Sequence, residues 1–126
     1  MAKILAVDDE PAILEMIESI LTKDGHLVTK VSNPLKLHME ELHHYDLILL
    51  DIMMPGMDGF ELCKRIRTIV DCPILFLTAK TEENSLVNRL SLGADDYISK
   101  PFGVMELQGS MHILEESTGN ILSGWF

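Results

Sequence analysis

Basic residues are scarce in this 126-residue sequence, and no stretch of the chain concentrates them. Lysine and arginine together number 10 against 20 aspartates and glutamates, so the formal net charge is −10. Proteins bind phosphate backbones through clustered lysines and arginines, and a surplus of negative charge repels those backbones. We therefore expect no direct binding of DNA or RNA by this chain.

Long hydrophobic runs and cysteines are also few. Runs such as 47–50 are far shorter than the roughly 20 residues of a membrane-spanning helix. The sequence enters a strand-like run directly after Met1-Ala2-Lys3, without the apolar region and cleavage site of a secretory signal. Two cysteines, Cys63 and Cys72, do not make a disulfide framework. These features predict a single domain with a cytoplasmic location and no membrane association.

Five short apolar runs alternate with helix-like segments along the chain. The runs cover 4–7, 27–31, 47–50, 74–77 and 97–98, and three of them are nearly continuous in Ile, Leu, Val and Phe. Such runs are typical of parallel strands covered on both faces. The second predicted helix begins at Asn33-Pro34 and would place Leu35, Met39 and Leu42 on one face. The order predicts an α/β fold, a five-stranded doubly wound parallel sheet with helices on both faces.

Polar residues follow the strands at the end where a ligand would bind. Asp8 and Asp9 follow the first predicted strand, Asp51 the third and Thr78 the fourth, and Lys100 comes shortly after the fifth. Ligands of open parallel sheets bind outside the carboxyl ends of the strands. We therefore expect these side chains to meet at one edge of the sheet.

The types of residue at this edge predict a metal-assisted reaction with phosphate. Three carboxylates in a small space cannot easily all be ionised, and an all-oxygen set favours a hard divalent cation such as Mg²⁺. Lys100 offers a point charge to a phosphoryl oxygen, and Thr78 offers a hydroxyl. A carboxylate with such neighbours can attack phosphorus. Asp51 is the best candidate, because it stands alone at the end of its strand.

At these residues the chain resembles the receiver domain of two-component response regulators, and most closely the winged-helix (OmpR-type) class of transcriptional regulators. The matching segments are 4–10, 46–59, 77–79 and 92–102, each at a strand end, and the likeness runs from Lys3 to about Gln108. The resemblance implies the flavodoxin-like strand order 2-1-3-4-5.

The resemblance also implies a role for each site residue. Asp51 corresponds to the phospho-acceptor, Lys100 to the phosphate-contacting lysine, and Thr78 to the hydroxyl that swings toward the phosphoryl group. Tyr97 corresponds to the aromatic switch residue that turns inward behind it. The implied Mg²⁺ ligands are Asp8, Asp9, Asp51 and the backbone carbonyl of Met53.

A receiver domain of this kind is a phosphorylation-activated switch and not an enzyme, apart from catalysing its own phosphorylation and dephosphorylation. The implied phosphoryl donor is a sensor histidine kinase. The implied output face consists of the fourth helix, the fifth strand and the fifth helix, and it would control an output domain or partner, through a homodimer in transcription regulators. Because the chain carries no effector domain, we expect it to be part of a longer regulator.

Two other classes of function are alternatives to a receiver domain. A Mg²⁺-dependent phosphohydrolase also works through an aspartyl phosphate, but such enzymes typically carry a second acid two positions after the nucleophile, where this chain has Met53. A receiver-like module that never takes up phosphate would not need the intact set Asp8, Asp9, Asp51, Thr78 and Lys100.

The last residues depart from the family pattern. We interpret residues 1–108 as the receiver core and 109–126 as an atypical segment, a short or frayed fifth helix and a tail that is foreign to the native domain. No basic residue follows Lys100, and Ser110 stands where the winged-helix class would have an arginine of its dimer interface. We therefore expect a weakened homodimer.

Overall fold

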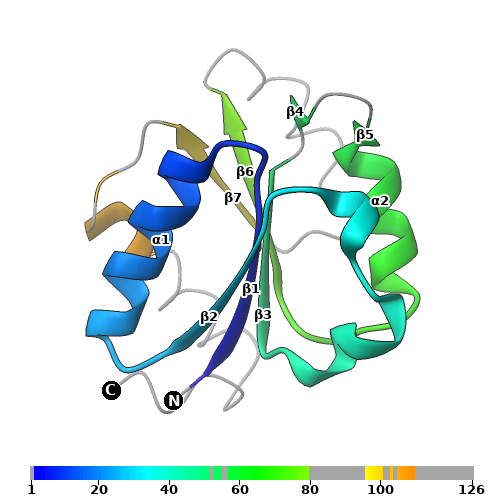
Figure 1. Ribbon diagram of the computed structural model, residues 1–126, viewed down its shortest axis with the longest axis horizontal. Coiled ribbons are helices and arrows are strands. Elements are labelled where there is room, and N and C mark those ends of the chain that lie inside the picture. Colours follow the sequence, from blue (N-terminus) through cyan, green and yellow to red (C-terminus); the bar gives the residue numbers. More distant parts are fainter. Residues whose placement is uncertain are drawn as a thin grey trace.

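The computed structural model describes residues 2–51, 53–54, 57–79, 96–100, 103 and 105–109 (Figure 1). In chain order, its elements are β1 (Lys3–Val7), α1 (Pro11–Lys23), β2 (Leu27–Val31), η1 (Pro34–Lys36), η2 (Met39–His44), β3 (Leu47–Asp51), β4 (Met53–Met54), β5 (Met57–Asp58), α2 (Gly59–Arg67), β6 (Ile74–Ala79) and β7 (Asp96–Lys100). Residues 105–109 form a further helical turn. The predicted helix over 81–93 and the segment 110–126 lie outside the described residues.

A parallel sheet forms the centre of the molecule. Its strands lie in the order β2-β1-β3-β6, and β7 pairs with β6 in parallel. The register pairs Ile4 with Val28 on one side and with Leu47 on the other. This arrangement confirms the predicted α/β class with a parallel sheet and helices.

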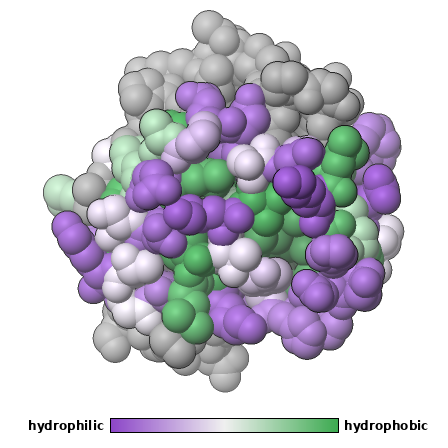
Figure 2. Space-filling view, viewed as in Figure 1, coloured by the Kyte–Doolittle hydropathy of each residue, from purple (hydrophilic) through white to green (hydrophobic). Residues whose placement is uncertain are grey.

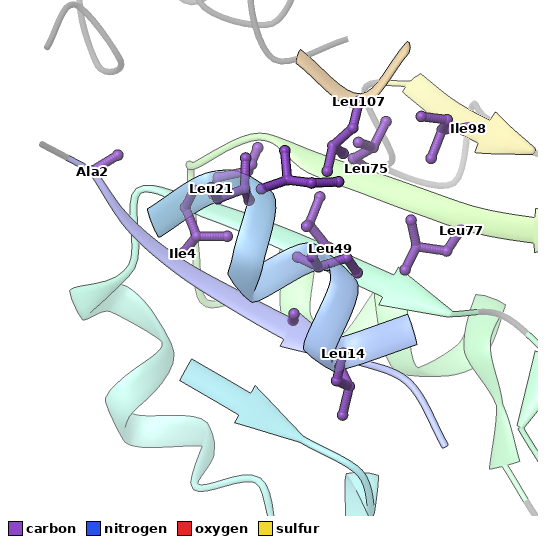
Figure 3. Close-up of a cluster of buried hydrophobic side chains, with 13 residues drawn as sticks. Ala2, Ile4, Leu14, Leu21, Leu49, Leu75, Leu77, Ile98 and Leu107 are labelled. Atoms are coloured by element: carbon purple, nitrogen blue, oxygen red, sulfur yellow. The ribbon is translucent and has the colours of Figure 1, made fainter. Parts of the chain in front are cut away.

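Alternate side chains of the strands form two separate hydrophobic cores. Residues such as Ile4, Leu49 and Leu75 face α1 and Leu107 (Figure 3). Their neighbours in sequence, such as Leu5, Leu50 and Phe76, pack with α2 and Leu42. Because side chains alternate along a strand, a strand buried on both faces is apolar at every position, as the sequence pattern indicated.

Helix α1 has clear local signals at both ends. Pro11 occupies the first turn, where its missing N–H costs nothing, and Gly25 follows the helix with φ of 88°. The predicted apolar stripe is buried against the sheet at Leu14, Ile17, Ile20 and Leu21. These contacts fix the position of the connection between β1 and α1, which contains Asp8 and Asp9.

The prediction of a second helix beginning at Asn33-Pro34 is wrong. The segment forms two short 3₁₀ helices, η1 and η2, separated by Leu37 and His38 in extended conformation. The Asn33 side chain accepts the Leu35 N–H at 3.0 Å, and of the predicted stripe only Leu42 is buried, whereas Leu35 is 81% exposed. Helices are stabilised mainly by packing of an apolar face, and of this stripe Leu42 is fully buried, Met39 is only partly buried against the core and Leu35 is exposed.

Three smaller observations complete the fold. Met53 pairs with Asp58 and Met54 with Met57 in the antiparallel ribbon β4-β5, which the sequence pattern did not predict. Cys63 and Cys72 are both buried free thiols. Within the described part of the chain, no helix is long and apolar enough to cross a membrane.

Candidate functional site

Two aspartates occupy neighbouring positions at the carboxyl ends of β1 and β3. The register pairs Val7 with Leu50, so Asp8 and Asp51 are the next residues along the two strands. Asp8 is 0% exposed and Asp51 is 2% exposed. Burial of ionised carboxylates is unfavourable unless their charge is compensated. This edge of the sheet is therefore the candidate site.

Backbone hydrogen bonds shape the turn that carries the acidic residues. The Asp8 N–H donates to the Val31 carbonyl at 3.1 Å, and the Glu10 N–H donates to Asp8 Oδ1 at 2.9 Å. Asp side chains commonly accept such a bond from the residue two positions on, which tightens a turn. The turn brings the carboxylates of Asp8, Asp9 and Glu10 together, with one oxygen of each within 4.8 Å of the others.

Asp9 links this turn to β3. Its partial burial raises the pKa of Asp9, and a hydrogen bond with Asp51 together with the negative charge of Asp51 raises that pKa further. A hydrogen bond between two carboxyl groups needs a proton, because an ionised carboxylate only accepts. When both groups are ionised, they repel each other, and a cation between them removes the repulsion.

The chemistry of these donors fits a magnesium ion. Carboxylate oxygens are hard ligands, and Mg²⁺ prefers them to sulfur or imidazole. Asp8, Asp9 and Asp51 are the carboxylates that the strand ends bring together. Glu10 also lies in this cluster, although no role was predicted for it from the sequence. The signal for Glu10 was its place in the acidic run 8–10 directly before Pro11 of α1.

The other predicted residues lie on neighbouring strands or just after β3. Asp51 pairs with Leu77, so Thr78 is one residue further toward the carboxyl end of β6. Lys100 is the last residue of β7, and Tyr97 lies within that strand. The side chains of Thr78, Tyr97 and Lys100 fall outside the described part of the structure, and their roles stay predictions.

Met53 begins β4, two residues after Asp51. The chain therefore leaves the parallel sheet after Asp51, the predicted phospho-acceptor, and enters the β4-β5 ribbon at Met53. The role of its carbonyl as a metal ligand stays a prediction.

A parallel sheet whose strand ends carry this acidic cluster is the framework of a receiver domain, and the family comparison agrees. The family model of the response regulator receiver domain matches residues 4–112, and the chain belongs to this family. This result confirms the predicted resemblance.

Curated relatives of the chain include regulatory proteins. The chain is 58% identical over 112 residues to the transcriptional regulatory protein SpaR of Bacillus subtilis, covering 89% of this chain and 51% of SpaR. It is 43% identical over 106 residues to the nisin biosynthesis regulatory protein NisR of Lactococcus lactis, covering 83% of this chain and 46% of NisR. The chain thus spans about half the length of the curated relatives it matches.

Solved structures share the fold. The receiver domain of the sensor histidine kinase PA1611 from Pseudomonas aeruginosa PAO1, with a magnesium ion coordinated in its active site cleft, is 33% identical. Its TM-score is 0.74, and the match covers 94% of this chain and 98% of that one. The N-terminal domain of the nisin resistance regulator NsrR, a lantibiotic response regulator, is 31% identical with a TM-score of 0.80, covering 90% and 97%.

Proposed function

We propose that this chain is a phosphorylation-activated switch that accepts a phosphoryl group on Asp51 from a sensor histidine kinase. The observation that carries the proposal is the buried Asp51, in contact with Asp9 and next to Asp8 at the carboxyl edge of the sheet. Receiver domains interact with sensor histidine kinases and are generally not enzymes, and the family match gives the chain this general role.

The proposed transfer is a single displacement at phosphorus. An oxygen of the Asp51 carboxylate forms the new P–O bond, the P–N bond of the phosphohistidine breaks, and the imidazole leaves with the electron pair. Mg²⁺ would be held by Asp8, Asp9, Asp51 and the Met53 carbonyl, and it supplies positive charge to the phosphoryl oxygens. Lys100 would add a second positive charge, and the Thr78 hydroxyl would donate a hydrogen bond.

The burial of Asp51 supports a covalent role over an ordinary surface turn. At 2% exposure, the carboxylate is shielded from bulk water by the strands beside it. Shielding strengthens electrostatic interactions within a site and limits competing hydrolysis. The magnesium ion coordinated in the active site cleft of the similar PA1611 receiver domain is a further support, since Mg²⁺ prefers oxygen ligands such as the carboxylates of this site.

The proposed output follows from the receiver class. Tyr97 and Thr78 would couple phosphorylation of Asp51 to the face made by the segment 81–93, β7 and the segment after Phe102. In the full-length protein this face would control an output domain or partner, and transcription in the cytoplasm. The regulatory relatives SpaR and NisR support this proposal. The proposal also includes a five-stranded sheet with the strand order 2-1-3-4-5, which the parallel pairing of β7 with β6 supports.

The test is phosphorylation by acetyl phosphate with MgCl₂, followed by intact-mass measurement. We expect the mass of one phosphoryl group to be added to the wild type and none to be added to Asp51→Asn. The adduct is an acyl phosphate, so hydroxylamine or base should remove it. Asp71→Asn, which changes an exposed aspartate elsewhere, is the matched control and should be phosphorylated normally. An equal yield on Asp51→Asn, or an adduct stable to base, contradicts the proposal.

A further inference from the structure

A cavity of about 290 Å³ lies at the end of the sheet opposite the acidic site. It opens between the connection from η2 to β3 and the loop from α2 to β6, which meet at the lower right of Figure 1. Its lining includes His43, Tyr45, Asp46, Ile69, Asp71 and Cys72. None of these residues belongs to the proposed phosphorylation site.

The cavity carries negative charge that its own walls do not neutralise. Asp46 and Asp71 both line it, and its described lining contains no lysine or arginine. The nearby Arg67 donates from its Nη1 to the Cys72 carbonyl at 3.1 Å. Hydrophilic side chains dominate the lower right of the described surface in Figure 2.

Hydrogen bonds hold the walls in place before any ligand arrives. The Lys3 N–H donates to Asp46 Oδ2 at 2.8 Å, which fixes the orientation of that carboxylate. The bond from Arg67 to the Cys72 carbonyl fixes the opposite wall. The Ile48 N–H donates to the Pro73 carbonyl at 3.0 Å and ties the two connections together. A preformed site loses less entropy when it binds a ligand.

Apart from the imidazole of His43, the rest of the lining is apolar or aromatic. Ile69 is 41% exposed, which is high for a large aliphatic side chain, and Cys72 is 7% exposed. Tyr45 is half-buried and contributes an aromatic ring. Such a surface suits the aliphatic stem of a long cationic side chain, whose charged head stays at the rim. Aromatic rings also attract cations.

We propose that this cavity binds a guanidinium or ammonium group carried on a short aliphatic stem. Asp46 and Asp71 would pair with the charged head, and Ile69 and Tyr45 would contact the stem. A guanidinium group suits a carboxylate best, because its planar fork can donate two parallel hydrogen bonds. The volume is at the lower limit for ligand pockets, which favours a single side chain or a small free cation over a larger ligand.

The test is an NMR titration of the whole chain at saturating MgCl₂, which would fill the proposed magnesium site at the other end of the sheet. One probe is N-acetyl-arginine amide, and its matched control is N-acetyl-citrulline amide, which has nearly the same shape without the charge. We expect the arginine probe to shift amides at 43–46 and 69–72, and the citrulline probe to shift them much less. Butylguanidinium distinguishes recognition of a free cation from recognition that needs the peptide backbone.

Variants locate the charges that matter. We expect Asp46→Asn and Asp71→Asn each to weaken the affinity by about two- to fivefold, the range of partly exposed ion pairs. An asparagine at 46 can still accept the Lys3 N–H, so the wall should keep its shape. Glu40→Gln removes an exposed charge of the same sign outside the cavity and should leave the affinity unchanged. Equal amide shifts with the arginine and citrulline probes would overturn the proposal. An unchanged affinity for the arginine probe in the variant that combines Asp46→Asn with Asp71→Asn would also overturn it.

Discussion

Asp9 shows how a single side chain connects the stability of this domain to its proposed chemistry. Burial and the neighbouring Asp51 raise the pKa of Asp9, so the ionised form is disfavoured in the folded protein. Near neutral pH this repulsion opposes folding, because the charged carboxylates are farther apart in the unfolded chain. A bound cation would convert the same arrangement into a stabilising one.

The first prediction at the residue scale concerns Asp9→Asn. Without Mg²⁺ we expect the variant to be at least as stable as the wild type at neutral pH, because the repulsion with Asp51 is gone. We expect its Mg²⁺ affinity to fall by at least about tenfold, since even outer-shell changes cost that much. Urea unfolding with and without MgCl₂ measures both effects, with Glu40→Gln, an exposed position outside both proposed sites, as the control. A variant that gains as much stability from Mg²⁺ as the wild type would argue against the assigned ligand.

A second prediction concerns His26, which is 2% exposed and accepts the Ala2 N–H on Nδ1 at 3.1 Å. Burial lowers the pKa of His26 from 6.5; the N-terminal charge also lowers it, while Asp24 opposes the shift. Because the unfolded chain binds the proton more tightly, the stability from this group is full above pH 6.5. It is lost as the pH falls toward the lowered folded pKa.

His26→Asn tests this sign. An asparagine oxygen can still accept the Ala2 N–H but does not titrate in this range. We expect the loss of stability between about pH 7 and about pH 5 to be smaller in the variant than in the wild type. Urea midpoints across this range provide the measurement. An identical loss in both proteins would show that other groups cause the acid sensitivity.

At the scale of the elements, the segment between β2 and β3 differs most from a regular α/β unit. Two 3₁₀ helices replace the expected α-helix, and η2 is held to the sheet by Leu42, which is 1% exposed. Partly buried Leu37 and Met39 pack against the same core. A segment with so few anchors depends heavily on each of them.

We therefore predict a strong contrast between two leucines of this segment. Leu42→Ala should lower the free energy of unfolding by about 2–5 kcal/mol, the usual cost of removing a buried leucine. Leu35→Ala, at an 81% exposed position, should change it by no more than about 0.5 kcal/mol. Equilibrium denaturation of the two variants provides the measurement. Similar effects at both positions would mean that this segment is held in another way.

At the scale of the whole molecule, two distinct regions lie at opposite ends of one sheet. The proposed phosphorylation site is at the carboxyl ends of β1 and β3, and the proposed cation site is at their amino ends. The start of the last helical segment is anchored, because Leu107 is 0% exposed and Gln108 donates to Asp24 at 3.0 Å. The family match runs to residue 112.

The prediction at this scale concerns assembly. Because no arginine or lysine follows Lys100, we expect phosphorylation to produce little dimer through the face that includes β7. Sedimentation velocity before and after treatment with acetyl phosphate and MgCl₂ measures this, with intact mass confirming the phosphorylated fraction. A tight dimer that appears only on phosphorylation would refute the idea that the segment from 109 onward weakens the interface.

The sequence by itself determined the parts of this protein that depend on local pattern. Continuous apolar runs predicted the strands, because a strand covered on both faces must be apolar throughout. The rule that ligands bind at the carboxyl ends of parallel strands then selected Asp8, Asp9 and Asp51. Of these, the structure brings Asp9 and Asp51 into contact and buries Asp8 beside them.

Only the tertiary structure decided what depends on contacts between distant segments. The pattern of Leu35, Met39 and Leu42 suits an α-helix, yet 3₁₀ helices form, because the packing leaves Leu35 exposed and buries Met39 only in part. The cavity that includes Asp46 and Asp71 joins two connections that are far apart in sequence and has no local signature. Local periodicity records which side chains prefer burial, whereas the packing of the whole chain decides which of them can be buried together.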